Sequence, residues 1–341
     1  MASELALSEH LKANFSLNGL PAQVFKPFWR DLAEFNQYFR QLMTSNVKIV
    51  DRVARYLVKH RGKQFRPALL LLSARSCGKL RRESFITAVV VELLHTATLV
   101  HDDVVDDAEL RRGFPTIHKI WKNKIAVLMG DYLLSKSLIL ATEVGSLEVM
   151  NLIATVAKRL IKGELFQLQK SRNLNITEAE YFQLIGDKTA SLISACCELG
   201  ALTAEAPEEH RRALRDYGEH LGLAFQIKDD MLDYEGSRFV LGKPTGLDIK
   251  EKKITLPLIY AFQSASEGER KYILKLIRKG ADRKKIREVI DFVRDHQGLE
   301  KARQKAFEIK DTAINRLALL PDSEARNALM DLADFVVHRT R

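Results

Sequence analysis

Apolar residues recur along most of the chain at spacings of three and four, which is the period of an amphipathic α-helix. Strict alternation between regularly spaced turns, the pattern of an all-β protein, is missing from the sequence. The expected helical segments are 28–60 (one or two helices), 66–76, 84–107, 125–143, 147–170, 178–201 and 208–234. The pattern predicts an all-α fold, a bundle of ten or more helices.

Local signals set some of the boundaries. Thr177 and Glu180 form a capping box, so a helix is expected to begin at Glu178. Residues 235–253 contain three glycines and a proline and are expected to form a loop. No low-complexity linker divides the sequence, so we expect a single domain over 1–341. Residues 1–25 carry no motif and are interpreted as either a helix at a dimer interface or a mobile tail.

Composition narrows the class of protein. Only 17 glycines and 8 prolines occur in 341 residues, which disfavours disorder and many-turned β structure. The net charge of +10 fits either a phosphate-rich partner or solvated basic helix faces. Segment 271–303 holds much of the excess, but aromatic residues are not interleaved with its Lys and Arg, so a nucleic-acid partner is not expected.

The cysteines and the apolar segments bear on location. Cys77, Cys196 and Cys197 include no CxxC pair, which favours a reducing compartment over a disulfide framework or zinc site. The adjacent pair lies in an apolar run and is interpreted as core. The first residues do not resemble a signal peptide. The apolar segment 84–100 is interrupted by charge and predicts a buried helix, not a membrane span. We therefore expect a cytoplasmic protein.

Two aspartate clusters carry the strongest chemical signal. Segments 102–107 (Asp-Asp-Val-Val-Asp-Asp) and 229–233 (Asp-Asp-Met-Leu-Asp) each contain the pattern DDxxD and each follow an apolar run. Residues four apart share a helix face, so Asp102 lies near Asp106, and Asp229 near Asp233. Carboxylates placed this way repel one another and require a cation. Mg²⁺ fits, because it takes one or two carboxylates and completes its shell with water and phosphate oxygens.

Basic residues lie close to these clusters in the sequence. Arg111 and Arg112 follow the first cluster, and arginine matches phosphate oxygens in a bidentate way. Lys63 and Arg66 stand at a predicted helix start, where backbone N–H groups also favour anions. Further candidates are Lys188, Lys243 and Lys253. Singly each is an ordinary surface charge, but together they suit two separate diphosphates.

These motifs resemble those of the trans-isoprenyl diphosphate synthase family, of the long-chain type. The resemblance spans about residues 45–260 and rests on seven motifs in family order: Gly-Lys-Gln-Phe-Arg-Pro (62–67), Leu-His-Thr-Ala-Thr-Leu-Val-His-Asp-Asp-Val-Val-Asp-Asp (94–107), Arg-Arg-Gly (111–113), Gly-Asp-Tyr-Leu-Leu (130–134), Lys-Thr-Ala (188–190), Phe-Gln-Ile-Lys-Asp-Asp-Met-Leu-Asp (225–233) and Gly-Lys-Pro-Thr-Gly-Leu-Asp (242–248). It implies a bundle around a deep central cavity and a homodimer.

The resemblance also implies roles for single residues. The metal ligands it implies are Asp102, Asp106, Asp229 and Asp233, with Asp103 and Asp230 in support. The implied contacts of the allylic diphosphate are Arg111, Lys188, Lys243 and Lys253, with Asp248 beside them in the closing region. The implied contacts of isopentenyl diphosphate are Lys63, Arg66, His95 and Arg112. Thr189 and Gln226 are expected to stabilise a carbocation. The cofactor implied is Mg²⁺, about three ions per active site with substrate bound.

The implied reaction is head-to-tail condensation of isopentenyl diphosphate with an allylic diphosphate. Metal and cations neutralise the leaving diphosphate, and a closed cavity protects the allylic cation from water. No side chain in the motifs is an obvious strong base, so the released diphosphate is the candidate proton acceptor. His95 lies two turns before Asp102, roughly on its face, which supports a ligand role over that of a core histidine.

Product length is predicted from the helix before the first cluster. Thr98 and Ala97, four and five residues before Asp102, are small where short-chain family members often carry an aromatic floor. Together with Leu94 they are the expected chain-length wall, and an open wall predicts an all-trans product of about thirty to forty-five carbons, such as a quinone side-chain precursor. A floor on another helix would instead give a short-chain product. The product is expected to leave to a membrane or carrier.

Other readings remain open at this stage. A short-chain synthase making farnesyl or geranylgeranyl diphosphate is the nearest rival. A terpene cyclase would not need the second diphosphate pocket, and a non-catalytic subunit of a heteromeric synthase is expected to lose one aspartate cluster. A purely structural helical scaffold would bind no diphosphate. Arg339 and Arg341 near the C-terminus are interpreted as solvated tail charges, with diphosphate contact as the alternative.

Overall fold

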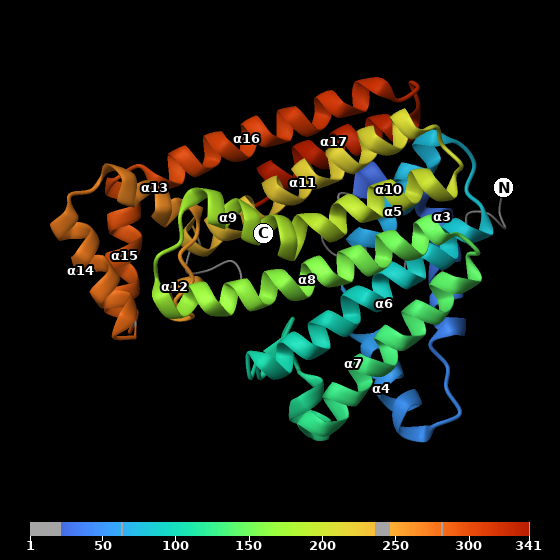
Figure 1. Cartoon of the computed structure of the whole chain (residues 1–341), viewed down its shortest axis with the longest axis horizontal. Helices are drawn as coiled ribbons and strands as arrows, with labels where there is room; N and C mark the ends of the chain where they lie inside the picture. The colour runs from blue at the N-terminus through green and yellow to red at the C-terminus, as the bar shows by residue number, and fades with distance from the viewer. Residues whose placement is uncertain (1–21, 63, 236–245, 281, 341) are drawn as a thin grey trace.

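The protein is a bundle of helices in its computed structural model, which describes residues 22–62, 64–235, 246–280 and 282–340 (Figure 1). The first elements are α2 (Ala22–Phe25), η1 (Lys26–Phe28), α3 (Trp29–Leu42), α4 (Lys48–Lys59), α5 (Phe65–Cys77), α6 (Arg82–Val105), α7 (Ile117–Glu143) and α8 (Leu147–Asn173). Within the described ranges, the strands are β1 (Leu110–Arg111) and β2 (Phe114–Pro115), an antiparallel pair between α6 and α7.

The second half continues as helices. These are α9 (Glu178–Ile185), η2 (Gly186–Ala190), α10 (Ser191–Thr203), α11 (Glu208–Glu235), α12 (Leu247–Lys250), α13 (Leu256–Ser264), α14 (Glu267–Arg278), α15 (Arg283–Asp295), α16 (Gly298–Arg316), η3 (Leu317–Leu319) and α17 (Glu324–His338). The prediction of an all-α fold with ten or more helices is confirmed.

Most predicted boundaries agree with the structure, and the exceptions have local causes. Glu178 begins α9 behind the predicted capping box, in which Thr177 Oγ1 accepts from the backbone N–H of Glu180. α7 begins at Ile117, earlier than predicted, because a non-helical φ of 72° at Lys122 interrupts its periodicity. The predicted 178–201 helix contains a π turn, η2. The predicted 235–253 loop contains α12, and residues 236–245 of that loop lie outside the described residues.

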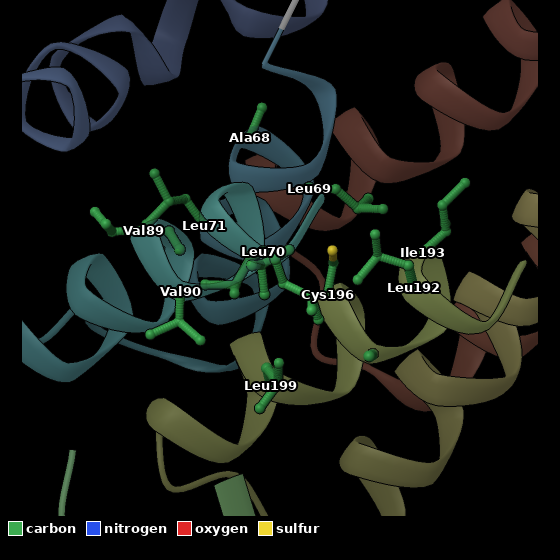
Figure 2. Close-up of a cluster of buried hydrophobic side chains, with 14 of the residues drawn as sticks. Ala68, Leu69, Leu70, Leu71, Val89, Val90, Leu192, Ile193, Cys196 and Leu199 are labelled. Atoms are coloured by element: carbon green, nitrogen blue, oxygen red, sulfur yellow. The ribbon is translucent and has the colours of Figure 1, made fainter. Parts of the chain in front are cut away.

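The larger hydrophobic cluster lies where α5, α6 and α10 meet. Leu70 of α5, Val90 of α6 and Cys196 of α10 have no exposed surface, and Figure 2 shows side chains of the three helices converging. The continuous apolar run at the start of α5 is therefore explained by burial on every side. The prediction that Cys196 and Cys197 are core residues is confirmed.

A second hydrophobic cluster forms around α13, α15 and α16, at one end of the molecule (Figure 1). α11 runs through both clusters, since Leu221 belongs to the first and Ile227 to the second. This sharing favours the predicted single domain, which stays a prediction for the chain as a whole.

Two of the described helices, α6 and α7, are long and apolar enough to cross a membrane. In α6 the most apolar window is 72% buried inside the protein, as in the core helix of a globular bundle. In α7 it is only 39% buried, and Leu128 and Ile139 are exposed on its surface. The two helices differ, therefore, in what covers them: α6 is covered by its own chain, and α7 presents apolar side chains outward.

Candidate active site

The first aspartate cluster lies at the C-terminal end of α6, opposite α8. Asp102 is half-buried, and burial together with the carboxylate of Glu164 raises its pKa to about 6. Lys188 Nζ lies 2.6 Å from Glu164 Oε2, but Glu164 Oε1 is buried without a hydrogen-bond partner. Asp106 adds a further carboxylate whose pKa is raised, first by burial. Negative charge therefore exceeds positive charge here, which suits an added cation.

The β hairpin secures the neighbouring carboxylate. Arg111 Nε donates to Asp103 Oδ1 at 2.6 Å, and Asp103 is buried while Arg111 is half-exposed. Arg111 thus reaches back from β1 to the end of α6. The charge of Arg111 is thus directed at Asp103.

The second aspartate cluster, at the end of α11, uses its three carboxylates differently. Asp229 Oδ1 accepts from Arg339 Nη2 at 2.6 Å. Asp230 is buried and accepts from the Tyr181 hydroxyl at 2.7 Å. Both oxygens of Asp233 accept from backbone N–H groups of α12, at 3.0 Å each. Asp233 therefore caps the first turn of α12, which explains a helix where a loop was predicted.

A chain of hydrogen bonds connects this cluster with η2. Thr189 Oγ1 donates to Gln226 Oε1 at 2.8 Å, and Gln226 Nε2 donates to Asp230 Oδ1 at 2.8 Å. Lys188, the residue before Thr189, also donates to Gln167 Oε1 at 3.0 Å. The predicted Lys-Thr pair thus links α8 with α11 at the site.

A cavity of about 140 Å³ lies between η2, α11 and the segment after α12. Predicted site residues that line it are Lys188, Thr189, Gln226, Asp230, Asp248 and Lys253. Burial and the Asp233 carboxylate raise the pKa of Asp248 to about 7. The cavity therefore combines four lysines (Lys170, Lys188, Lys252 and Lys253) with two carboxyl groups, Asp230 and Asp248, whose charged forms are disfavoured by burial.

A second cavity, of about 80 Å³, lies between α4, α6 and the β hairpin. Its lining includes Arg61, Glu92, His95 and Arg112. Arg66 Nη1 donates to His95 Nε2 at 2.9 Å, so His95 is the acceptor and is neutral, and burial beside Arg66 lowers its pKa well below the usual value. Arg66 Nε and Arg61 Nη1 are buried without hydrogen-bond partners, which suits an anion bound between them.

The backbone at Gly62 contributes to this second cavity. A Cβ at Gly62 would overlap the guanidinium of Arg112, so the glycine lets Arg112 lie directly against the chain. Predicted site residues Lys63 and Lys243 lie outside the described residues.

Metal ligands were predicted from both clusters. Among the described residues, no group of three or more His, Cys, Asp or Glu side chains is arranged to hold a metal on its own. Mg²⁺ commonly takes only one or two carboxylates plus substrate phosphate oxygens. The unpartnered oxygen of Glu164 and the raised pKa of Asp102 fit such a partly open site.

The predicted chain-length wall lies on α6. Leu94 and Ala97 are buried in the larger hydrophobic cluster, and Thr98 is half-buried one turn before Asp102. Of the three, Thr98 is therefore the residue with appreciable exposed surface.

Several residues at the site were missed by sequence reasoning. Glu164 and Gln167, one turn apart on α8, interrupt an apolar stretch, which was an available signal. Glu92, which lines the second cavity, was interpreted only as a charge that interrupts the apolar segment 84–100. Tyr181 gave no signal in the sequence.

The interpretation of Arg339 as a solvated tail charge is wrong. Its side chain is 9% exposed, because its guanidinium stacks on Phe225 and binds Asp229. Arg341 lies outside the described residues.

Comparison with known proteins identifies relatives over nearly the whole chain. Residues 47–293 match the polyprenyl synthetase family. Octaprenyl diphosphate synthase of Escherichia coli is 35% identical over 92% of this chain and 97% of its own. A short chain isoprenyl diphosphate synthase of Methanothermobacter thermautotrophicus is 38% identical over 84% of this chain and 90% of its own.

Solved structures give the same result. Decaprenyl diphosphate synthase of Rhodobacter capsulatus is 40% identical, with a TM-score of 0.88 over 94% of this chain and 99% of its own. Polyprenyl synthase of Caulobacter crescentus, complexed with calcium and isoprenyl diphosphate, is 35% identical, with a TM-score of 0.87 over 96% of this chain and 98% of its own. Sequence and fold thus point to one family.

Proposed function

The chain belongs to the polyprenyl synthetase family and is a prenyltransferase, and we propose that it condenses isopentenyl diphosphate with an allylic diphosphate to make a long all-trans chain. One observation carries the choice of reaction: there are two separate charged cavities, one between η2 and α11 and the other beside α6. The first is lined by lysines together with Asp230 and Asp248, and at the second, arginines have unpartnered buried N–H groups. The pair suits one diphosphate that ionises and one that does not.

The first cavity, between η2 and α11, is the proposed site of the allylic diphosphate. Asp102, Asp106 and Asp229 would hold Mg²⁺, about three ions with substrate bound by the family expectation. Asp103 and Asp230 support them through Arg111 and Tyr181. Asp233 contributes by ordering α12, which carries Asp248 toward Lys253. A relative crystallised with calcium and isoprenyl diphosphate supports a divalent cation beside a diphosphate.

Two of the proposed contacts of the allylic diphosphate, Lys188 and Lys253, line the first cavity. Lys188, now paired with Glu164, would turn to the allylic diphosphate together with Arg111, Lys243 and Lys253. Bound Mg²⁺ would supply charge that stabilises the departing diphosphate. Because Thr189 and Gln226 hold each other by a hydrogen bond, their oxygens are fixed at the cavity wall, where they would stabilise the allylic cation.

The arginine-rich cavity is the proposed site of isopentenyl diphosphate. Arg66 and Arg112, with Lys63, would bind its oxygens, and the buried, unpartnered Nε–H of Arg66 suits such an acceptor. Neutral His95 would orient Arg66 and could donate through its other ring nitrogen. Closure of both cavities would exclude water during reaction.

Product length is proposed as about thirty to forty-five carbons, from the small wall residues Ala97 and Thr98 and from long-chain relatives that include octaprenyl and decaprenyl synthases. The alternative is a short-chain product, which the short-chain relative keeps open. A non-catalytic subunit is disfavoured, since both aspartate clusters are present.

We also propose a homodimer in the cytoplasm. The exposed apolar residues of α7, including Leu128 and Ile139, would be covered by a second copy. The long product would leave to a membrane, where a polyprenyl chain serves as a quinone side-chain precursor.

The test is an assay with labelled isopentenyl diphosphate, Mg²⁺ and farnesyl diphosphate, with product length read by mass spectrometry. Products of about thirty carbons or more would support the proposal. Such products need a deeper cavity wall, and each helical turn adds about 5.4 Å of wall. Products that stop at farnesyl or geranylgeranyl length with every allylic primer would move the protein to the short-chain class. No condensation with any primer would overturn the proposed function.

A further inference from the structure

The π turn η2 interrupts one continuous helix at the residues that line the active-site cavity. η2 covers Gly186–Ala190, between α9 and α10, and it presents Lys188 and Thr189 to the cavity. A π turn holds one residue more than the α-helical turn it replaces; such turns are rare and frequently lie at functional sites. Something must therefore hold this turn in place.

One guanidinium group, carried by α8, bonds to both η2 and α11. Arg159 of α8 donates from Nε to Asp187 Oδ1 at 2.8 Å, and from Nη2 to the Gly186 carbonyl at 3.2 Å. The same Nη2 donates to Glu219 Oε1 of α11 at 3.0 Å. Lys162 Nζ, 3.3 Å from Asp187 Oδ2, adds a second cation. Arg159 therefore ties α8, η2 and α11 together.

Backbone packing leaves η2 little room to move. A Cβ at Gly163 of α8 would lie 2.9 Å from the backbone nitrogen of Lys188. A Cβ at Gly222 of α11 would lie 2.5 Å from Ala190 Cα. The turn is thus enclosed between two glycine surfaces, and Arg159 bonds to its first two residues.

The residues that hold η2 in place, Arg159, Asp187 and Glu219, are called the clamp, and they do not line the cavity. Arg159, Asp187 and Glu219 are absent from the cavity lining, whereas the two residues that follow Asp187 belong to it. Asp187 is 8% exposed, and its carboxylate is satisfied by Arg159 and Lys162. Any effect of Arg159 on the reaction must therefore pass through Lys188 and Thr189.

We propose that Arg159 is a positioning residue for the condensation: its bonds to Asp187, Gly186 and Glu219 hold η2 as a π turn and so aim Lys188 and Thr189 into the cavity. If the turn relaxed to α-helix, the helix register would shift by one residue, which would rotate the side chains of η2 by about 100° relative to one of the flanking helices. A misplacement of about 1 Å at a reacting group can cost ~100-fold in rate. The inference rests on the proposed function, and it adds a cluster outside the motifs that indicated that function.

The decisive variant is Arg159→Met, which keeps the alkyl chain and removes the guanidinium. We expect kcat to fall ~10- to 100-fold while the KM for isopentenyl diphosphate changes by less than about threefold, because the second cavity is untouched. Amide hydrogen exchange of residues 186–190 should become faster than in the wild type. Lys158→Met is the matched control, since Lys158 is the exposed neighbour on α8. It should change neither kcat and KM nor the amide exchange of residues 186–190.

A second variant guards against simple loss of folding. Asp187→Asn keeps the side-chain volume and should give the same split between kcat and KM at a temperature where the variant remains folded. The proposal is overturned if both variants keep wild-type kcat, or if kcat and both KM values deteriorate in parallel with the melting temperature, as a purely structural role would give.

Failure of the proposed function can be told apart from failure of the clamp. If the wild type condenses nothing, exchange at residues 186–190 is still measured with and without inorganic pyrophosphate and Mg²⁺. Faster exchange in Arg159→Met alone would support the clamp, and equal exchange in Arg159→Met and wild type would overturn it.

Discussion

Arg339 Nη2 lies 2.6 Å from Asp229 Oδ1, so the last turn of the chain supplies a cation to the second aspartate cluster. The guanidinium also stacks on Phe225, with its carbon 4.1 Å from the ring centroid, and donates to the Phe225 carbonyl. In Figure 1 the C-terminus accordingly projects over the middle of the bundle. A metal ion bound by Asp229 would have to displace or share this contact.

Arg339→Gln is therefore expected to ease metal binding to the substrate-free protein. Removing the competing guanidinium should lower the Mg²⁺ concentration that gives half of the thermal shift by ~3- to 10-fold, a modest effect because Asp229 is 41% exposed. The measurement is thermal unfolding across a magnesium titration. Arg316→Gln, at an exposed arginine at the end of α16, is the control. An unchanged or raised half-saturation point would contradict the competition.

Gly62→Ala tests the second cavity without altering any charge. The added Cβ must push the Arg112 guanidinium aside, so the KM for isopentenyl diphosphate should rise ~10-fold or more, as expected for a lost charged hydrogen bond. The KM for the allylic substrate should change little. Gly268→Ala, where the new Cβ meets open space, is the matched control. Equal changes in both KM values would mean that Arg112 does not serve isopentenyl diphosphate alone.

Thr98→Phe and Ala97→Phe test the chain-length wall. Both are expected to shorten the product, since a ring there narrows the path away from Asp102, and Thr98 has the more open surface. Product length is read by mass spectrometry, with melting temperature recorded in parallel because Ala97 is buried and a larger side chain there costs ~1–3 kcal/mol. Unchanged products from both folded variants would place the floor on another helix.

Glu180→Gln tests the pH dependence of stability at the start of α9. Lys170, 2.6 Å away, and the backbone N–H of Thr177 lower the pKa of Glu180 to about 2. The stabilisation is then complete above the unfolded pKa of about 4.5 and is lost as the pH falls toward 2. The difference in melting temperature between wild type and variant should therefore shrink below about pH 4.5. Glu209→Gln, at an exposed glutamate of α11, should show no such trend.

Thiol labelling tests the core interpretation of the cysteines. Burial raises the pKa of Cys77 to about 11, that of Cys196 to about 12, and that of Cys197 well above its usual range. Since the thiolate is the reactive form, a disulfide reagent at about pH 8 should label the native protein slowly. All 3 thiols should react rapidly in denaturant. Rapid labelling of the native chain would contradict this packing.

Helices and clusters were open to prediction because their causes are local. The 3.6-residue period, the capping box at Thr177 and the four-residue spacing of Asp102 and Asp106 are all fixed by neighbours in sequence. The same holds for the seven motifs that indicated the family. These features need no knowledge of what the helices pack against.

The tertiary structure alone decided which charged side chains meet across the bundle. Glu164 meets Lys188, Arg159 meets Asp187, and Arg339 meets Asp229 through contacts 24, 28 and 110 residues apart in sequence. The spacing of charges along one helix cannot indicate which charge on another helix faces it. The sequence by itself therefore determined the helical class and the reactive groups, whereas the packing of α8, α11 and α17 decided which groups are paired and which stay free to bind a ligand.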